Sequence, residues 1–413
     1  MDALNIIYIL HRFPSLTETF VAEEILRVQR IGVKVHIYSL LPPKKELTHP
    51  VSLELKPQVC YVPGIYAPSL WWAQAYFLCK FPGQYLQLLQ VLLVQPAPKF
   101  SIILKRIVTF LNSIWVAKEL EKSQVQLVHT HFAWLSAAAS LIVSQLLDLP
   151  FTITTHAFDI YSGKNDILEL TTRMADRIVT ISEFNKQAML NTCGSLKAEK
   201  IKVIRCGIDP DNFHVKGRQL ENKVFQITSV GSLIEKKGHE YLIRACSELK
   251  FQGLDFHCVI VGGGKLEQPL RALIHELELE DVVTMAGPQT QIWIKDRLCR
   301  SDLFVLACVV SGDGDRDGIP VSIMEALAME VPVVSTPVSG IPELVQHGET
   351  GLLVPERSAS SLAATITRLA QDKPLRQKLA QQGRTKVEKD YDITKNVSQL
   401  VELFQQVIEE RAR

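Results

Sequence analysis

The sequence has almost no net charge and no excess of either sign. Its 45 Lys and Arg residues nearly balance its 44 Asp and Glu residues, which leaves a formal charge of +1. Without a positive excess, the chain has no long-range attraction for nucleic acid, and we expect no nucleic-acid partner. Charged residues make up 22% and hydrophobic residues 47% of its 413 residues. This composition excludes a disordered chain or a coiled coil and leaves a folded α/β or α protein.

The sequence also lacks the usual signs of disulfides, of secretion and of a membrane span. The eight cysteines form no CxxC pair, and none lies beside a histidine at metal-ligand spacing. The N-terminal segment has no basic start or cleavage site of a signal peptide. No stretch reaches 18 uninterrupted apolar residues, and 64–79 comes closest. We therefore expect reduced thiols, no membrane-spanning helix and a cytoplasmic protein. Peripheral contact with the cytoplasmic face of the membrane is a further hypothesis.

Charge and periodicity divide the chain into two lobes. Residues 1–205 carry a net charge of +6 and the remainder −5. In each lobe, short β-branched runs alternate with amphipathic helical stretches, a pattern typical of a parallel sheet covered on both faces. The polar segment 205–222 separates them. We predict two doubly wound, Rossmann-like α/β domains, 1–205 and 206–391, and a final helix, 392–413, that could cross back to the first domain.

The stretch from Leu55 to Ala117 differs from the rest in composition. It holds five basic residues, no acidic residue and eight Trp, Tyr and Phe residues in its helical segments; the basic residues are Lys56, Lys80, Lys99, Lys105 and Arg106. Basic helices with aromatic residues on an apolar face suit an anionic membrane surface. The alternative is a helical insertion packed on the sheet. Peripheral membrane contact is therefore a hypothesis.

Two glycine-rich turns follow strands of the second lobe, where open parallel sheets bind ligands. In 231–238 (GSLIEKKG), Lys236 and Lys237 stand just before a helix expected to start near Gly238. Lysines at a helix N-terminus favour an anion such as phosphate. The run 262–265 (GGGK) lets backbone amides approach a ligand. Alternatively, these are a solvated basic loop and a tight structural connection.

The segment 311–345 is the most informative one. A loop with three Asp and three Gly residues runs into a helix expected to begin near Pro320, with Asp317 ahead of it and Glu325 inside it. The free amides of the first turn suit an anion, and two carboxylates suit neutral hydroxyls of a sugar or ribose. A ligand with hydroxyls at both ends and phosphates in the middle satisfies both requirements. The alternative makes Asp317 a helix cap and Glu325 a surface residue.

In the first lobe, His156 follows the strand 151–155, and Asp159 lies three residues further on. His129 and His131 flank Thr130 at the end of another strand, and we expect them to point to opposite sides, so that only one faces a ligand. The loop before the first helix offers Thr17 as an expected cap and Glu18 in the expected first turn. These residues are candidates for the acceptor side of a site.

Together these segments resemble the retaining glycosyltransferases of family 4, over nearly the whole chain. The resemblance rests on GSLIEKKGHEYLI, VIVGGGKL, DGIPVSIMEALAMEVPVVST, SGIPELV and HGETGLLV in order; RFPSLTETF and TTHAFDIY resemble the subgroup with colanic-acid-type exopolysaccharide glycosyltransferases. The resemblance implies the GT-B fold, two facing Rossmann-like domains with a cleft between them. It also implies a nucleotide-diphosphate-sugar donor linked to UDP or GDP, and a glycan or lipid-linked acceptor.

The resemblance also assigns roles to individual residues. It places Lys237 at the donor diphosphate, Glu325 at the ribose, Asp317 at the donor sugar and His156 near the reacting centre. The other expected donor-side residues are Gly231, Ser232, Lys236, Gly263, Gly264, Gly318, Ile319, Pro320 and Val321; the acceptor side takes Thr17, Glu18, His131 and Asp159. His156, Lys237 and Asp317 are the expected catalytic residues. As in this family generally, we expect no metal and no cofactor.

Two positions depart from the family pattern. Asp317 replaces the first Glu of the family's E-x7-E motif, and Ser232 replaces an Arg that would contact the diphosphate. These departures keep two alternatives open: a nucleotide-sugar epimerase of the same fold, and a non-catalytic nucleotide-sugar-binding protein. A dinucleotide dehydrogenase fits less well, because no strand is followed by GxGxxG with an acid about 20 residues later. The main prediction is a hexosyl transfer with retention of anomeric configuration, in exopolysaccharide or cell-envelope glycan synthesis.

Overall fold

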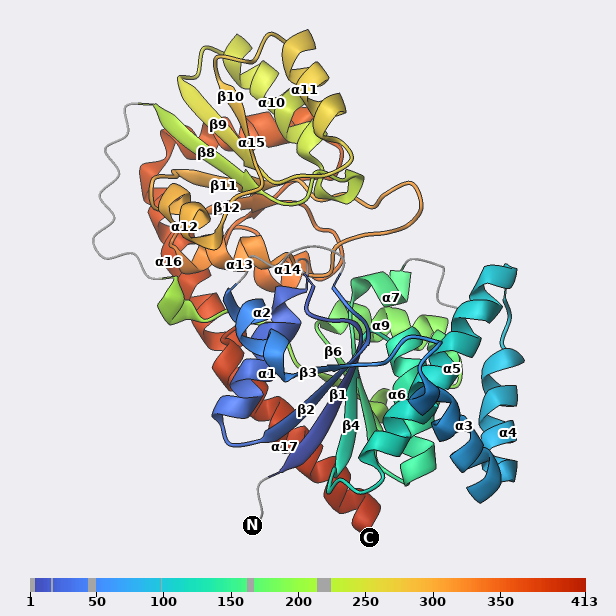
Figure 1. The fold of residues 1–413 in the computed structure, drawn as a ribbon. Coiled ribbons are helices and arrows are strands. Elements are labelled where there is room, and N and C mark those ends of the chain that lie inside the picture. Colours follow the sequence, from blue (N-terminus) through green and yellow to red (C-terminus); the bar gives the residue numbers. More distant parts are fainter. Residues whose placement is uncertain (1–3, 16–17, 44–49, 98, 162–166, 214–223) are drawn as a thin grey trace. The chain divides into compact units, whose positions relative to one another are not determined.

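The computed structural model describes residues 4–15, 18–43, 50–97, 99–161, 167–213 and 224–413. The chain forms two compact units, the first made of Met1–Ile204 and Val397–Arg413 and the second of Arg205–Asn396. Each unit contains one parallel β-sheet with helices packed against it (Figure 1). The expected linker 205–222 is described only as far as residue 213.

The first unit is built on a seven-stranded sheet with the strand order β3-β2-β1-β4-β5-β6-β7. Every neighbouring pair is parallel, as the alternation of strands and helices predicts. The strands are β1 Asn5–Arg12, β2 Lys34–Leu41, β3 Val59–Tyr61, β4 Leu127–His131, β5 Phe151–Thr155, β6 Arg177–Thr180 and β7 Ile201–Val203. Because the strands are parallel, the carboxyl ends of β1, β4 and β5 lie at one edge of the sheet.

The two faces of this sheet are covered differently. On one face, apolar strand residues such as Ile7, Val128 and Ile153 form a core with helices α3 to α6. On the other face, alternate residues such as Tyr8 and His129 meet polar side chains and the last helix. The helices of this unit are α1 Thr19–Arg30, α2 Pro50–Leu55, α3 Pro68–Lys80, α4 Pro82–Leu93, α5 Phe100–Leu120, α6 Leu135–Leu147, α7 Ala157–Tyr161, α8 Leu168–Met174 and α9 Glu183–Thr192.

Among the described residues, α5 is the one helix long and apolar enough to cross a membrane, so 64–79 is not the closest stretch by this measure. Half of its most apolar 18-residue window is buried in the protein, and Phe110, Ile114 and Val116 pack in the core. A core helix meets the same criterion, so the match is weak evidence for a span. Its Arg106 is fully buried and donates to backbone carbonyls of Leu92, Gln95 and Pro96, so this predicted surface cation is structural.

The second unit has a six-stranded parallel sheet with the order β10-β9-β8-β11-β12-β13. The strands are β8 Phe225–Val230, β9 Phe256–Val261, β10 Val283–Gly287, β11 Leu303–Leu306, β12 Val333–Ser335 and β13 Leu352–Leu353. The helices are α10 His239–Phe251, α11 Glu267–Glu276, α12 Gln291–Cys299, α13 Val321–Ala328, α14 Ile341–Leu344, α15 Ala359–Gln371 and α16 Lys373–Asp390. The strand order changes direction at β8, so ligands are expected at the carboxyl ends of β8 and β11.

Helix α17 (Ile393–Ala412) starts in the second unit and packs on the first. Phe404 is fully buried, with its ring 4.9 Å from that of His129. Near its end, Arg411 pairs with Asp148 at 2.7 Å and with Asp176 at 3.4 Å. The chain therefore crosses between the units twice, and the last helix completes the first unit.

Candidate active site

The candidate site of the second unit lies at the carboxyl ends of β8 and β9, where the backbone is unusually close-packed. A Cβ atom at Gly262 would lie 1.9 Å from the carbonyl oxygen of Gly231, and one at Gly264 would lie 2.5 Å from that of Leu233. At Gly238, which has φ +65°, a Cβ would lie 1.7 Å from the carbonyl oxygen of Ala307. Only glycine fits these positions. Their glycines thus hold the loop bearing Lys236 and Lys237 close to the end of β11.

A lysine and an aspartate, both predicted site residues, meet at this edge. The Lys237 Nζ atom lies 2.7 Å from Asp317 Oδ2, and their side chains are only 14% and 13% exposed. Burial alone would lower the pKa of Lys237, but Asp317 raises it. Burial alone would raise the pKa of Asp317, but Lys237 and Lys236 together lower it. Both groups are therefore charged at neutral pH, which leaves an ammonium held beside a carboxylate at the sheet edge.

Lys236 extends this cluster toward the Asp-rich loop. Its Nζ atom lies 3.1 Å from Asp315 Oδ2 and 3.8 Å from Asp317 Oδ1. The thiol of the buried Cys308 lies 3.5 Å from Asp317, and burial followed by Asp317 raises the pKa of this thiol. The cysteine is thus a neutral hydrogen-bond donor. Two lysines and two aspartates form the charged cluster of the second unit.

The Asp-rich loop leads into α13, which begins at Val321 with Pro320 at its N-terminal cap position. Asp317 is therefore not the cap that the alternative interpretation required. Glu325 is half-buried, and Gln291 donates to its Oε1 over 3.4 Å. Burial raises the pKa of Glu325 to about 7, while Gln291 and Lys295 act in the opposite direction. A carboxyl group held this way can accept a hydrogen bond from a ligand hydroxyl once it ionises.

The remaining donor-side candidates surround these charges. Gly318, Ile319 and Pro320 are buried and lead from Asp317 to the first turn of α13 at Val321. In that turn, Ser322 donates to the carbonyl oxygen of Val230 over 2.9 Å, which ties α13 to the end of β8. The exposed side chain of Ser232 and the backbone of Gly263 lie in the two glycine-rich turns. The structure thus brings the predicted donor-side residues to one edge of the second sheet.

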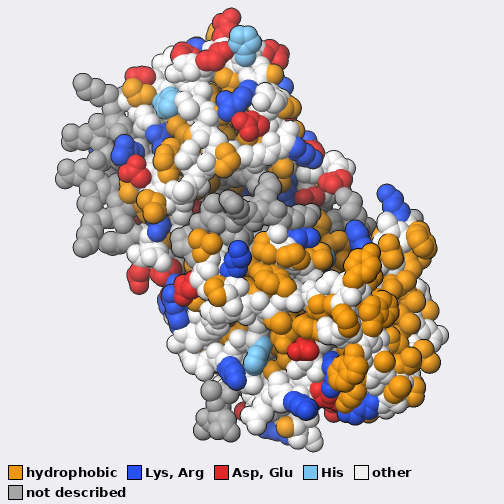
Figure 2. All heavy atoms as spheres, in the orientation of Figure 1, with side chains coloured by type: hydrophobic (Ala, Val, Ile, Leu, Met, Phe, Trp, Pro, Cys, Tyr) orange, Lys and Arg blue, Asp and Glu red, His pale blue; other side chains and the backbone are white. Residues whose placement is uncertain are grey.

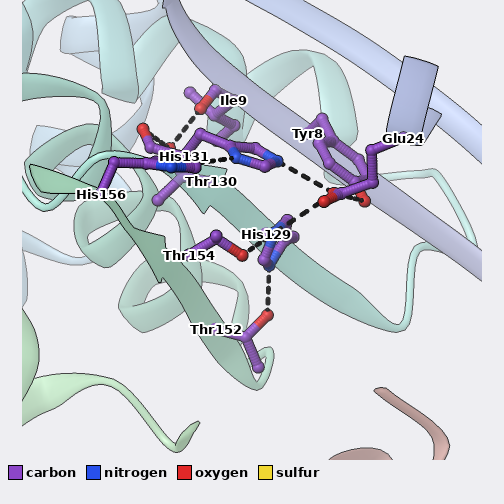
Figure 3. Close-up of polar contacts among 9 residues, drawn as sticks. All are labelled: Tyr8, Ile9, Glu24, His129, Thr130, His131, Thr152, Thr154 and His156. Carbon is purple, nitrogen blue, oxygen red and sulfur yellow. Dashed lines mark hydrogen bonds and ion pairs between the residues drawn. The ribbon is translucent and has the colours of Figure 1, made fainter. Parts of the chain in front are cut away.

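A separate polar cluster in the first unit is a line of hydrogen bonds between buried and half-buried side chains (Figure 3). His156 Nε2 lies 3.1 Å from His131 Nδ1, and His131 Nε2 lies 2.9 Å from Glu24 Oε1. Tyr8 donates to the same carboxylate over 2.8 Å. The rings of His131 and His156 stack, with centroids 5.4 Å apart. Three elements and the residue after β5 thus converge on one polar cluster.

The expectation that His129 and His131 point to opposite sides is wrong. Residues two apart in a strand share a face, and their ring centroids are 5.3 Å apart. His129 Nε2 lies 4.0 Å from Glu24 Oε1, and its two nitrogens face Thr152 at 2.8 Å and Thr154 at 3.2 Å. Ligand atoms of Glu24, His129 and His131 lie within 4.8 Å of one another, as a metal site would require. The ring nitrogens of His129 and His131 and the Oε1 atom of Glu24 already take part in hydrogen bonds within the protein.

The other first-unit candidates have defined places. Asp159 is buried and accepts from the amides of Ala133 (2.7 Å) and His156 (2.8 Å), so it joins two strand ends. Burial raises its pKa to about 7 against the effect of these amides. Helix α1 begins at Thr19, so Glu18 precedes the helix instead of lying in its first turn. Thr17 lies outside the described residues.

Glu24 and Tyr8 are absent from the candidates predicted from the sequence. The position of Glu24 in its helix could have identified it. Helix α1 buries Val21, Ile25 and Val28, and Glu24 lies three and four residues from the first and last of these. An acidic residue on the apolar stripe of an amphipathic helix calls for a buried partner. Tyr8 carried no such signal, because a tyrosine in a buried strand is ordinary.

Two family models match consecutive parts of the chain. "Glycosyltransferase Family 4" matches residues 17–212, and "Glycosyl transferases group 1" matches residues 211–386. Together they span both units. The chain belongs to these glycosyltransferase families. The resemblance to family 4 read from the sequence is therefore confirmed, and the motifs around Lys237, Asp317 and Glu325 all fall within the second model.

Curated relatives of this glycosyltransferase-family chain include proteins of exopolysaccharide synthesis. The amylovoran biosynthesis glycosyltransferase AmsK of Erwinia amylovora is 41% identical over 210 residues, 51% of this chain and 52% of AmsK. A putative colanic acid biosynthesis glycosyltransferase, WcaL of Escherichia coli, is 43% identical over 195 residues, 47% of this chain and 48% of WcaL. The matches thus span about half the length of these relatives.

Solved structures share the fold of this family member over nearly its whole length. A glycosyltransferase from Rickettsia africae has a TM-score of 0.72 at 19% identity and covers 99% of both chains. Anabaena HepE in complex with UDP-glucose has a TM-score of 0.71 at 16% identity, covering 97% of this chain and 99% of HepE. The predicted fold class, two Rossmann-like domains of the GT-B type, is confirmed.

Proposed function

We propose that the protein is a retaining glycosyltransferase that moves a sugar from a UDP- or GDP-linked donor to a glycan or lipid-linked acceptor in exopolysaccharide synthesis. The observation that carries the proposal is the partly buried Lys237–Asp317 pair at the carboxyl end of β8, inside a group 1 family match. AmsK and WcaL are named for exopolysaccharide synthesis, and HepE was crystallised with UDP-glucose. These names support the substrate class.

Donor binding would rearrange the ion pairs of the charged cluster. The diphosphate of the donor replaces the Asp317 carboxylate beside Lys237, because two phosphates carry more charge than one carboxylate. Asp317, 13% exposed and released from the ammonium, then accepts hydrogen bonds from hydroxyls of the donor sugar. The ionised Glu325 accepts from the ribose. This exchange explains why acids and cations share one edge of the sheet.

The chemistry would rest on stabilising the leaving group. As the bond between sugar and diphosphate breaks, negative charge grows on the phosphate, and the fixed ammonium of Lys237 and the first turn of α13 stabilise it. The departing phosphate oxygen, on the same face as the incoming hydroxyl, takes the acceptor proton. Retention follows because attack and departure share one face. No metal or cofactor is part of this proposal.

The test is incubation of the purified protein with UDP- and GDP-sugars, with and without a membrane lipid extract. Acceptor-dependent release of nucleotide, with an α-linked product from an α-linked donor by NMR, supports the proposal. Isomerised donor without acceptor identifies the epimerase, and binding without turnover identifies the non-catalytic protein. An inverted product contradicts retention while leaving glycosyl transfer intact.

We propose further that helices α3 to α5 contact the surface of an anionic membrane. Of the seventeen exposed large hydrophobic residues in the described chain, ten fall within residues 65–104, among them Trp71, Trp72, Leu86, Val94 and Phe100. Figure 2 shows orange side chains gathered over this part of the first unit. Exposed apolar patches of this extent mark interaction surfaces, and Trp and Phe favour the membrane interface.

The charge around this surface favours a bilayer with anionic lipids over a protein partner. Lys56, Lys80, Lys99 and Lys105 are exposed, and residues 55–117 contain no acid. Lys80 forms an ion pair with Glu121 at 2.6 Å. The other three lysines, Lys56, Lys99 and Lys105, do not share this carboxylate. Basic side chains around an apolar patch are attracted to anionic headgroups. A lipid-linked acceptor would then lie in the same surface.

Flotation with vesicles tests the membrane contact without any assay of transfer. Wild type should float with vesicles rich in phosphatidylglycerol, less with phosphatidylcholine alone, and less at high salt. Trp71→Ser combined with Phe100→Ser should abolish flotation. The matched control replaces Phe251 and Ile292, which are 94% and 81% exposed on the second unit. Failure of wild type to float at low salt, or equal loss in the control, contradicts the proposal.

A further inference from the structure

Phe132 has a backbone conformation that is unusual for an aromatic residue. Six non-glycine residues of the described chain have a positive φ: Phe132, Asp148, Glu278, Glu330, Ser339 and Arg357. Asp148, Glu278 and Glu330 lie at or just beyond the ends of α6, α11 and α13, where a left-handed residue commonly ends a helix. Phe132, with φ +66°, instead directly follows strand β4. A bulky side chain is strained in this conformation, so the surrounding structure must enforce it.

Hydrogen bonds from three neighbouring elements hold the turn that contains Phe132. The Phe132 amide donates to the carbonyl oxygen of Thr154 over 2.8 Å, and the Ser136 hydroxyl donates to the Phe132 carbonyl oxygen over 3.2 Å. The amide of the next residue, Ala133, donates to Asp159 over 2.7 Å. Strand β5 and helices α6 and α7 therefore fix the backbone on both sides of Phe132.

The positive φ explains why the Phe132 ring lies outside the apolar core of the first unit. Alternation along β4 would place Phe132 on the face of Val128, which packs in the core with helices α3 to α6. The ring does not join that core. It lies beside the rings of His156 and Phe20, with centroids 4.6 and 6.4 Å away, and stays half-buried. Packing in that core therefore does not account for an aromatic residue at this strained position.

The surroundings of the Phe132 ring suit a sugar better than a phosphate or a hydrocarbon chain. Phe20 of α1 is half-buried as well, and the half-buried Glu18 lies two residues before it. A sugar ring has apolar C–H faces that pack on aromatic rings, and hydroxyls that donate to a carboxylate. A carboxylate repels a phosphate, and covering it with a hydrocarbon chain costs its hydration. Two aromatic rings near a carboxylate therefore favour a neutral sugar ring.

We propose that Phe132 is a specificity-determining residue of an acceptor subsite, in which one face of an acceptor sugar ring packs against the Phe132 ring. The proposal rests on the proposed function, which gives the protein a glycan or lipid-linked acceptor. The strained backbone keeps the ring at the carboxyl edge of the first sheet, beside His156, the residue expected near the reacting centre. The acceptor sugar would lie at that edge.

Fluorine NMR tests sugar binding without any enzymatic activity. The full chain carries fluorinated phenylalanine, and Phe132→Tyr assigns the Phe132 signal by its loss. The probe is the glycan fraction released by mild acid from a membrane lipid extract, added without donor. The Phe132 signal should shift on titration, while the signal of Phe251, which is 94% exposed on the second unit, should not. A Phe132 signal that the glycan fraction leaves unchanged overturns the proposal.

Phe132→Ala and Phe132→Gly form a matched pair, because both remove the ring and only glycine relieves the positive φ. The glycine variant should have the higher urea midpoint, and the acceptor KM should rise about tenfold in both with the donor KM unchanged. Phe132→Tyr keeps the flat ring and should stay within a few-fold of wild type. Phe184→Ala, which alters a ring 40% exposed on α9, is the control and should leave the acceptor KM unchanged. An acceptor KM that follows stability instead of the ring overturns the proposal.

The two experiments separate the acceptor subsite from the proposed function. If the glycan fraction shifts the Phe132 signal but no donor supports transfer, the proposed function fails and the subsite stands. If transfer is detected and the acceptor KM of Phe132→Ala is that of wild type, the subsite is overturned and the proposed function stands.

Discussion

The two units stabilise their partly buried carboxylates in different ways. The first unit uses hydrogen bonds, and the second unit uses ion pairs with lysines. In the first unit, the carboxylate of Glu24 is hydrogen-bonded to Tyr8 and His131. In the second unit, two aspartates form ion pairs with lysines. Lys237 pairs with Asp317, and Lys236 pairs with Asp315. A hydrogen-bonded line can move a proton at little cost in charge separation, whereas an ion pair can be replaced by a ligand of higher charge.

The largest expected effect is that of Lys237→Ala on transfer. Removing the ammonium leaves Asp317 a partly buried carboxylate without its 2.7 Å partner and removes the cation expected at the diphosphate. Loss of one such stabilising group typically lowers kcat about 100- to 1,000-fold. Steady-state kinetics with the donor that proves active would measure it. Lys265→Ala, an exposed lysine on the neighbouring glycine-rich turn, is the control and should stay within a few-fold of wild type. Near-normal turnover by Lys237→Ala contradicts the site.

Gly238→Ala should destabilise the protein by distorting the backbone of the loop that carries Lys236 and Lys237. A Cβ there would lie 1.7 Å from the Ala307 carbonyl oxygen, and φ is +65°, so the variant combines overpacking with strain. We expect a loss of about 3 kcal/mol in the free energy of unfolding, measured by urea denaturation. Gly253→Ala is the matched control. It has φ +76° with nothing within 4 Å, and it should lose only about 1 kcal/mol. Equal losses would show that close packing at Gly238 is unimportant.

The sequence predicted the donor-side edge better than the first unit, for a physical reason. Glycines with a forced conformation and lysines beside them are local signals, and Gly238, Lys237 and Asp317 come together as expected. The polar cluster of the first unit joins residues more than a hundred positions apart, from Glu24 to His131. Only the strand order β1-β4-β5 brings them together. Strand periodicity does place His129 and His131 on one face.

Glu325→Gln should separate ligand binding from stability by its pH dependence. The folded pKa of about 7 lies above the usual 4.5, so the folded state binds more protons, and wild-type stability falls as pH rises from about 4.5 to 7. The variant should remove this fall and be more stable above pH 7 by about 1 to 2 kcal/mol, the half-burial limiting the effect. Donor affinity of wild type should rise through pH 7 as the carboxylate forms, and the variant should lose this rise. Thermal melts and calorimetry across pH 5 to 9 measure both.

The smallest expected effect is a gain from Ser232→Arg, which restores the arginine of the family pattern and adds an exposed cation to the donor edge. Ser232 is exposed at the end of the β8 turn, so a longer side chain can reach solvent without displacing the core. An exposed charge pair contributes at most about 1 kcal/mol, which corresponds to about a fivefold tighter diphosphate. Titration with UDP and GDP at low and high salt would detect it, and the gain should shrink as salt rises. Ser232→Gln adds comparable length without charge; if it gains as much as the arginine, added contacts and not charge explain the tighter binding.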